Sequence, residues 1–248
     1  MVQSLDEPSP RETETKPPPG LFFTGTDTDV GKTFVTACVA HALRAEGGPV
    51  AVCKPVATGA EWDGAAWRSG DTRLLAAAAG ESDLAAVTPW AFPDPVAPPV
   101  ATRRAGVVLT LAEIVGAVRG RLRPDVPLLV EGVGGLLCPL TERETVADLA
   151  AALGLPLIVV ARRGLGTLNH TLLTLEAARG HGLTVAGVVV NEVAPARGLA
   201  DETNVDELRR LGVPVLAVVP HQERPVPGAL PELAAVARLV GRRESVEE

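Results

Sequence analysis

Nearly continuous apolar runs recur along the chain, separated by amphipathic segments. The runs cover 21–24, 50–53, 127–130, 156–161, 184–190 and 214–219. They are rich in Val, Leu and Ile and do not alternate with polar residues, as expected of strands buried on both faces. The pattern therefore predicts the strands of a mostly parallel sheet.

The segments between these runs have the periodicity of helices. They cover 32–46, 71–79, 110–122, 145–153, 167–180 and 202–211, and most end beside a glycine, which commonly follows a helix. Strands alternating with helices imply right-handed crossovers. The sequence thus predicts an α/β fold with a doubly wound sheet and helices on both faces.

No linker divides residues 20–240, so we expect a single domain there. Residues 1–19 are polar, charged and Pro-rich, and predict a disordered extension without the apolar core of a secretory signal. Residues 241–248 predict a charged tail. The Pro-rich segment 88–99 predicts a stiff loop of a length that is often functional.

The composition of the chain excludes some classes of binding partner and indicates which residues build the core. The net charge of −7 argues against nucleic acid and anionic membrane surfaces, and no apolar run is long enough to span a bilayer. The three cysteines, Cys38, Cys53 and Cys138, form no C-x-x-C pair, which favours buried thiols in a reducing cytoplasm. Only 3% of residues are aromatic, so Val, Leu, Ala and Ile must build the core.

A phosphate-binding loop follows the first apolar run. Gly31, Lys32 and Thr33 match the end of a P-loop, in which backbone N–H groups and the lysine bind phosphates and the hydroxyl binds Mg²⁺. Gly25 begins the loop, which is one residue longer than the usual G-x-x-x-x-G-K-[ST]. The segment predicts ATP and Mg²⁺ on a P-loop NTPase-like fold; the alternative is an ordinary turn with an exposed lysine.

Two acidic residues, Asp27 and Asp29, lie inside this loop. Carboxylates repel a triphosphate, so they require another explanation. A cationic or amine-bearing substrate beside the γ-phosphate would provide one.

Ligands of parallel α/β sheets bind beyond the carboxyl ends of the strands. Lys54 follows the second run and either neutralises an anion or is a solvated lysine at a turn. Glu131 follows the third run, like a Walker B carboxylate directed at Mg²⁺, because a buried carboxylate needs a partner. Asp71 opens a predicted helix, either as its N-cap or as a Mg²⁺ ligand.

Two later strand ends also carry polar groups. The glycine-rich turn at 164–170 leads into a helix and could bind a substrate carboxylate, or be an ordinary turn with a threonine cap. Asn191 offers an amide that matches the edge of adenine, or forms an Asx turn.

Together these segments resemble the dethiobiotin synthetases, ATP-dependent ligases of biotin biosynthesis. The matching stretches are TGTDTDVGKT (24–33), KPVATG (54–59), SGD (69–71), VEGVGG (130–135), GLGTLNH (164–170) and VNEV (190–193). The resemblance implies that 7,8-diaminopelargonate takes up CO₂ as a carbamate. The carbamate then accepts the γ-phosphoryl group of ATP, and the second amine closes a cyclic urea.

The resemblance also assigns residues to roles. The catalytic set is Thr26, Asp29, Lys32, Lys54 and Thr58. The ATP set is Asp29, Val30, Gly31, Lys32, Thr33, Phe34, Asp71, Glu131, Asn191, Pro220 and Gln222. The Mg²⁺ set is Thr33, Asp71 and Glu131. The substrate set is Thr58, Gly166, Thr167, Leu168 and Asn169, the last four from the partner subunit of a homodimer.

The sequence departs from the family pattern in a few places. Asp29 stands where many members have Glu, Thr58 where Ser is common, and Ala97 where a hydroxyl residue occurs; the chain has no Tyr. These departures bear on substrate affinity rather than on the type of reaction.

The main alternative is an ATPase switch of the partition or septum-placement type. Such proteins carry a second lysine near the start of the P-loop, where this chain has 24–26, Thr-Gly-Thr, and their membrane-binding tail contrasts with the acidic end of this chain. A cobyrinate-type amidotransferase would need a glutaminase domain, which the sequence does not predict. A catalytically inactive nucleotide-binding domain is a further alternative.

Overall fold

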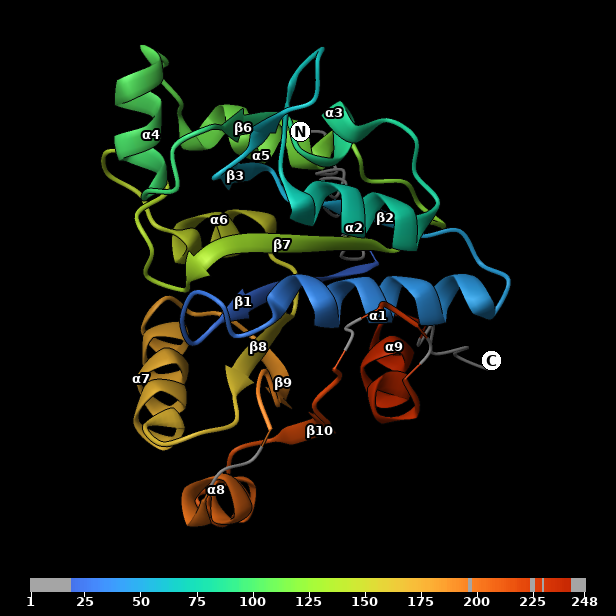
Figure 1. The fold of residues 1–248 in the computed structure, drawn as a ribbon, viewed down its shortest axis with the longest axis vertical. Coiled ribbons are helices and arrows are strands. Elements are labelled where there is room, and N and C mark those ends of the chain that lie inside the picture. The colour runs from blue at the N-terminus through green and yellow to red at the C-terminus, as the bar shows by residue number, and fades with distance from the viewer. Residues whose placement is uncertain (1–18, 196–197, 224–225, 229, 242–248) are drawn as a thin grey trace, which may run out of the picture.

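Six parallel strands form the central sheet, in the order β10-β9-β8-β1-β7-β2 (Figure 1). The structure is a computed structural model that describes residues 19–241 except 196–197, 224–225 and 229. The predicted extension (1–19) and tail (241–248) lie outside the described residues except for Pro19, which accepts a hydrogen bond from Leu128, and Gly241, which ends α9. The strands are β1 (Gly20–Gly25), β2 (Ala51–Cys53), β7 (Leu128–Gly135), β8 (Leu157–Arg162), β9 (Val185–Asn191) and β10 (Val215–Val219).

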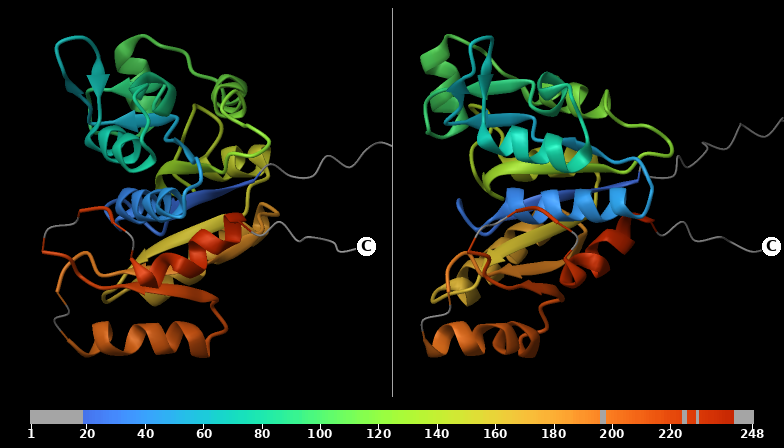
Figure 2. Two further views of the ribbon diagram at one scale, coloured as in Figure 1. Left: turned by 90° about the vertical axis from the view of Figure 1, so that its right-hand side faces the viewer. Right: turned by 45° about the vertical axis from the view of Figure 1, so that its right-hand side comes forward.

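Helices cover both faces of this sheet (Figure 2). The longer ones are α1 (Lys32–Ala45), α2 (Gly70–Ala79), α5 (Leu111–Arg119), α6 (Val146–Leu153), α7 (Thr167–Gly180), α8 (Leu199–Arg210) and α9 (Ala234–Gly241). Successive residues of β1 point to opposite cores: Phe22 packs with α5–α8, and Phe23 with α1, α2 and α9. The predicted α/β fold with helices on both faces is confirmed.

The end of β7 differs from the prediction. The strand continues through Glu131 to Gly135, although the apolar run ends at Val130. Gly25 of β1 pairs with Gly135 after a shift of register, so the central position of the strand overrides the low strand preference of glycine. Glu131 therefore lies within a strand rather than after it.

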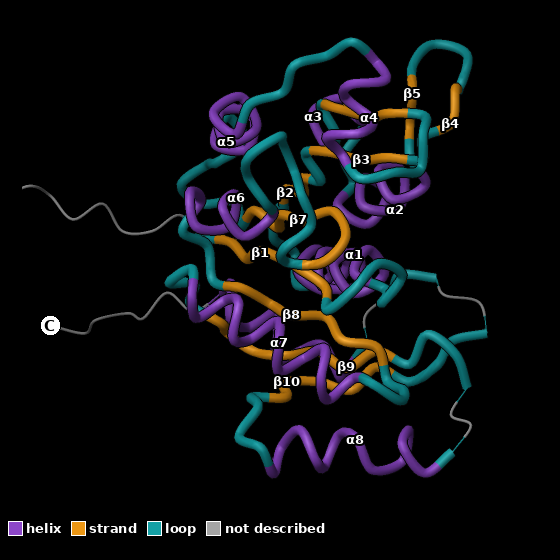
Figure 3. The backbone as a smooth tube through the Cα atoms, turned by 90° about the vertical axis from the view of Figure 1, so that its left-hand side faces the viewer, coloured by secondary structure: helices purple, strands orange, loops and turns teal. Residues whose placement is uncertain are grey.

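A small subdomain lies above the central sheet (Figure 3). It contains the parallel pair β3 (Val56–Thr58) and β6 (Trp90–Phe92), and the hairpin of β4 (Glu61–Trp62) and β5 (Trp67–Arg68). The expectation of a continuous loop over 88–99 is wrong, because β6 lies in it and α4 (Pro98–Ala105) begins in it. Proline suits the first turn of a helix, where its missing N–H leaves no bond unmade.

Three further short elements escaped the prediction. They are α3 (Leu84–Val87), the 3₁₀ turn η1 (Pro231–Leu233) and α9. Val236 of α9 is fully buried in the core that α1 also lines, so packing against α1 stabilises this short helix. In the described part of the chain, no helix has the length and apolar character needed to cross a bilayer.

Candidate functional site

The loop between β1 and α1 has an unusual backbone. Asp29 and Gly31 both have positive φ, 57° and 86°. The Asp27 carboxylate accepts a hydrogen bond from the N–H of Thr28 at 2.7 Å. The backbone carbonyl of Asp27 accepts one from Lys32 Nζ at 2.9 Å. Of the two acids in the loop, only Asp29 lines the pocket beside it.

Lys54 lies directly after β2 and is 5% exposed. Its ammonium donates to Oε1 of Glu131 at 2.8 Å and to the Asp71 carboxylate. Burial alone would lower the pKa of Lys54, but the two carboxylates outweigh burial and raise it. The interpretation as a solvated lysine is wrong, and Lys54 is a buried cation.

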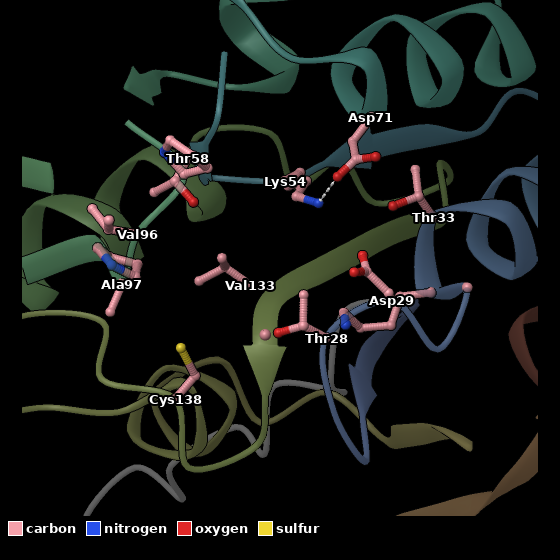
Figure 4. A pocket seen from close by; sticks show the side chains of 15 residues that line it. Thr28, Asp29, Thr33, Lys54, Thr58, Asp71, Val96, Ala97, Val133 and Cys138 are labelled. Atoms are coloured by element: carbon pink, nitrogen blue, oxygen red, sulfur yellow. Dashed lines mark hydrogen bonds and ion pairs between the residues drawn. The ribbon is translucent and has the colours of Figure 1, made fainter. Parts of the chain in front are cut away.

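Asp71 is not the N-cap of α2. The cap is Ser69, whose hydroxyl accepts a hydrogen bond from the N–H of Thr72 at 3.0 Å. Asp71 lies in the first helical turn and pairs with Lys54, as Figure 4 shows. Because Ser69 caps the helix, the Asp71 carboxylate is not needed as a cap, and it lines the cavity beside Lys54.

Glu131 is fully buried within β7. Its Oε1 accepts hydrogen bonds from Thr33 Oγ1 at 2.7 Å and from Lys54. Its Oε2 is buried and has no hydrogen-bond partner among the described residues. A buried carboxylate oxygen without a partner is costly, so a bound cation suits this position.

The set of Thr33, Asp71 and Glu131 fits Mg²⁺, which takes a few carboxylates and completes its shell with phosphate and water oxygens. The described residues contain no cluster of three His, Cys, Asp or Glu side chains that could hold a metal on their own. A site of one hydroxyl and two carboxylates would leave the other ligand positions of Mg²⁺ to phosphate and water oxygens.

Lys32 begins α1 and is also largely buried. Burial lowers the pKa of its ammonium more than the nearby Glu131 carboxylate raises it. A phosphate bound at the loop would stabilise this desolvated charge, as in other P-loops.

Lys32, Thr33, Lys54 and Asp71 line one cavity of about 800 Å³ (Figure 4). Its charged part is lined by Thr28, Asp29, Gly31, Lys32, Thr33, Lys54 and Asp71. Its less polar part is lined by Thr58, Pro95, Val96, Ala97, Pro98, Val133, Gly134 and Cys138. The cavity thus joins a phosphate-binding end to an end suited to an alkyl chain.

Several residues expected at the site do not line this cavity. Thr26 donates its N–H to the carbonyl of Val160 at 2.9 Å, and Val30 is fully buried. Phe34 packs against the core around α1. Glu131 does not line the cavity itself but bonds Thr33 and Lys54, which do, and Pro220 and Gln222 follow β10 outside the cavity.

Asn191 lies at the end of β9, and its Nδ2 donates to the Val30 carbonyl at 3.1 Å. The Asx-turn interpretation is wrong, because this bond reaches the P-loop and not the residue's own turn. The side chain is 5% exposed and touches the phosphate loop from outside the cavity.

The segment 166–169 begins α7 and lies outside the cavity of its own chain. Gly166 is the N-cap with φ 93°, and Thr167 is the first helical residue. The Thr167 hydroxyl is buried without a partner among the described residues, so the interpretation as a threonine cap is wrong.

Sequence reasoning missed several residues of the cavity. Thr28 and Val133 lie inside the matching stretches 24–33 and 130–135 but were given no role, and Cys138 lies outside every matching stretch. Cys138 was expected to be buried like the other cysteines, but it is partly exposed and lines the cavity. Cys53 is buried as expected, and burial raises its pKa to about 12.

Comparisons with known proteins place the chain among relatives. A family model described as an AAA domain matches residues 19–227. The ATP-dependent dethiobiotin synthetase BioD of Aromatoleum aromaticum is 44% identical over 90% of this chain and 99% of its own length. That of Anaeromyxobacter dehalogenans strain 2CP-C is 44% identical over 90% of this chain and 95% of its own length.

A solved structure shares the fold at low sequence identity. The MinC:MinD cell division protein complex of Aquifex aeolicus matches with a TM-score of 0.53 and 13% identity, over 92% of this chain and 98% of that chain. At this identity the likeness supports the α/β architecture alone.

Proposed function

The chain belongs to the dethiobiotin synthetase family and is an ATP-dependent ligase, and on that premise we propose how its cavity performs the reaction. The substrates are 7,8-diaminopelargonate, CO₂ and ATP, and the products are dethiobiotin, ADP and phosphate. The single observation that carries this proposal is the buried Lys54 ammonium, held between Asp71 and Glu131 at the edge of the P-loop.

ATP places its phosphates at the N-terminus of α1, where free backbone N–H groups and Lys32 attract anions. The adenine lies on the other side of the loop, towards Asn191, Pro220 and Gln222. Val30, Gly31 and Phe34 frame the phosphates between these two ends.

Thr33, Asp71 and Glu131 would hold Mg²⁺. When bound, the ion would supply positive charge that offsets the negative charge developing during phosphoryl transfer. The unpartnered Oε2 of Glu131 supports this assignment.

The carbamate forms when one amine of the substrate adds to CO₂ and loses a proton. A carbamate oxygen attacks the γ-phosphorus, the bond to the β-phosphate oxygen breaks, and ADP leaves. Lys32 and Lys54 stabilise the anionic carbamate and the transferring phosphoryl group, because this step depends on positioning and electrostatics.

The second amine then attacks the carbonyl carbon and the C–O bond to the phosphate breaks. The urea ring closes as phosphate leaves and the attacking nitrogen releases a proton to solvent. Asp29 attracts the substrate's amine end beside the γ-phosphate, and Thr58 contributes a hydroxyl for its orientation. The alkyl chain extends past Val96 and Val133 in the less polar part of the cavity.

We further propose a homodimer, in which segment 166–169 of a partner subunit receives the substrate carboxylate. The position of this segment outside the cavity of its own chain supports the proposal. The three cysteines are free thiols, which fits an enzyme that works in the cytoplasm.

The test is release of ADP with bicarbonate, measured with and without 7,8-diaminopelargonate, together with detection of the cyclic urea by mass spectrometry. We expect ADP release that depends on the diamine and that Lys54→Met abolishes. ATP turnover that ignores the diamine would instead favour an ATPase switch.

A further inference from the structure

The phosphate loop is held from outside by a side chain of a distant strand. Asn191 ends β9, and β8 lies between β9 and β1 in the sheet (Figure 1). Its Nδ2 reaches past β8 and donates to the Val30 carbonyl at 3.1 Å, in a buried position. The backbone of Asn191 is itself fixed, because its carbonyl accepts the N–H of Arg163 at 2.8 Å.

This bond sets the orientation of one peptide group. The Val30 carbonyl and the Gly31 N–H belong to the same planar trans peptide and point in opposite directions. Because the carbonyl faces Asn191, the Gly31 N–H faces away from it. Gly31 lines the cavity, so this N–H is available to a phosphate.

The fit between Asn191 and the loop leaves no space. A Cβ atom on Gly31 would lie 2.0 Å from Nδ2 of Asn191. Gly31 and Asp29, on either side of Val30, have left-handed backbone angles. Glycine adopts such an angle without strain, but a non-glycine residue such as Asp29 keeps it only where the surroundings enforce it. Asn191 supplies that enforcement at Val30.

We propose that Asn191 is a positioning residue of the phosphate loop, which orients the Gly31 N–H toward the phosphates whether or not a base is bound. The inference rests on the proposed use of the cavity for ATP. It separates a role toward the phosphates from the role toward adenine that the family resemblance implies.

A ligand without a base distinguishes the two roles. Magnesium tripolyphosphate carries the phosphates of ATP but no adenine, and its binding can be measured by titration calorimetry beside that of magnesium ATP. We expect Asn191→Ala and Asn191→Asp to weaken tripolyphosphate binding by about three- to tenfold, the effect of losing one buried hydrogen bond. Two different substitutions at Asn191 are used so that binding can still be measured if one of the two variants does not fold.

Gln222→Ala is the matched control, since this residue lies on the proposed base side and away from Val30. It should weaken ATP and leave tripolyphosphate binding as in the wild type. The proposal is overturned if both Asn191 variants, shown to be folded by circular dichroism, bind tripolyphosphate like the wild type. It is also overturned if the wild type does not bind tripolyphosphate, because the loop would then not be preformed.

Failure of the proposed function would look different. In that case the wild type would bind tripolyphosphate and respond to the Asn191 variants, but its ADP release would not depend on the diamine.

Discussion

The ammonium of Lys54 lies 2.8 Å from Oε1 of Glu131, a carboxylate that solvent does not reach. A buried ion pair of this kind adds little net stability, because desolvation offsets the attraction between the charges. Its presence at the P-loop is better explained by chemistry, since Glu131 fixes the ammonium of Lys54 at the cavity and keeps one buried carboxylate oxygen without a partner among the described residues.

Glu131→Gln should reduce diamine-dependent ADP release by about 100-fold or more, as loss of a preorganised electrostatic contact does. The amide keeps the volume of the side chain but removes its charge from Lys54 and from the proposed Mg²⁺ site. Steady-state ADP release is the measurement, and Glu207→Gln, on the exposed face of α8, is the control. Turnover of Glu131→Gln equal to that of the control would contradict the assignment.

The smaller variant Glu131→Ala is less informative. It would leave the buried Lys54 with Asp71 alone, and breaking a buried pair costs about 3–5 kcal/mol. Loss of activity could then reflect loss of the fold, so urea unfolding has to accompany the assay.

Lys32→Met should lower ADP release by about 100-fold or more, since its ammonium stabilises charge on the transferring phosphoryl group. Stability should change by less than about 1 kcal/mol, because Lys32 makes one hydrogen bond, to the Asp27 carbonyl, and removing a desolvated charge offsets its loss. The ADP assay measures the loss of turnover and urea unfolding measures the change in stability, with Arg179→Met at an exposed position as the control. Near-normal turnover would show that the lysine does not contact ATP.

Much of the site followed from the sequence because its residues come directly after buried apolar runs. The runs before Lys54 and Glu131 are continuous, so both residues had to meet at one edge of the sheet, near the P-loop. The sequence predicts the chemical role of each of these two residues, but it does not predict which side chain each of them bonds. Whether Lys54 is solvated or a buried cation depends on its two partners, Glu131 on the neighbouring strand and Asp71 at the start of α2.

The remaining features depend on tertiary packing. Ser69 and Asp71 are both acceptable helix caps, and only the fold decides that Ser69 caps α2. The bond from Asn191 to Val30 spans 161 positions and leaves no local signal. Cys138 lines the cavity just beyond the end of β7. The sequence does not predict that this strand continues past its apolar run, because residues 132–135 are mostly glycine.

The hairpin of β4 and β5 carries a pair of exposed tryptophans. Trp62 and Trp67 contact each other edge to face at 5.6 Å, in a hairpin that connects Thr58 with Asp71. Such a contact contributes about 0.5–1.5 kcal/mol, and a two-stranded hairpin is marginal without support. Trp67→Ala should therefore raise the KM for the diamine by about threefold to tenfold, with kcat changed less.

The signature of this contact is the exciton couplet of the two indoles in circular dichroism, which Trp67→Ala should remove. Trp67→Phe should restore part of the KM effect, because a phenyl ring retains an edge-to-face contact. An unchanged KM after loss of the couplet would show that the hairpin does not position Thr58 or Asp71.

A capping box at the start of α6 makes stability depend on pH. The N–H of Thr145 donates to the Asp148 carboxylate at 2.7 Å, and this bond holds the pKa of Asp148 below its usual value. Asp148→Ala should cost about 0.5–2 kcal/mol of unfolding free energy at pH 7. A depressed pKa stabilises the fold above the unfolded-state pKa, so the difference should shrink as the pH falls below about 4.

Urea unfolding of the wild type and Asp148→Ala at several pH values tests this sign. Ser82→Ala, just before the short helix α3, serves as a control that carries no titrating group. A difference between wild type and Asp148→Ala that stays constant, or grows, under acid would rule out the carboxylate as the stabilising group.

Gly31→Ala and Gly47→Ala form a matched pair for the phosphate loop. The two glycines have nearly the same φ, 86° and 87°, but a Cβ at Gly47 meets nothing within 4 Å, whereas at Gly31 it would collide with Asn191. Gly47→Ala should therefore cost only the backbone strain, about 1 kcal/mol, and leave ATP binding intact. Gly31→Ala should cost more and should weaken ATP binding at least tenfold, because the loop or Asn191 has to move. Urea unfolding and ATP titration give both quantities, and equal effects of the two substitutions would mean that Asn191 yields without consequence for the loop.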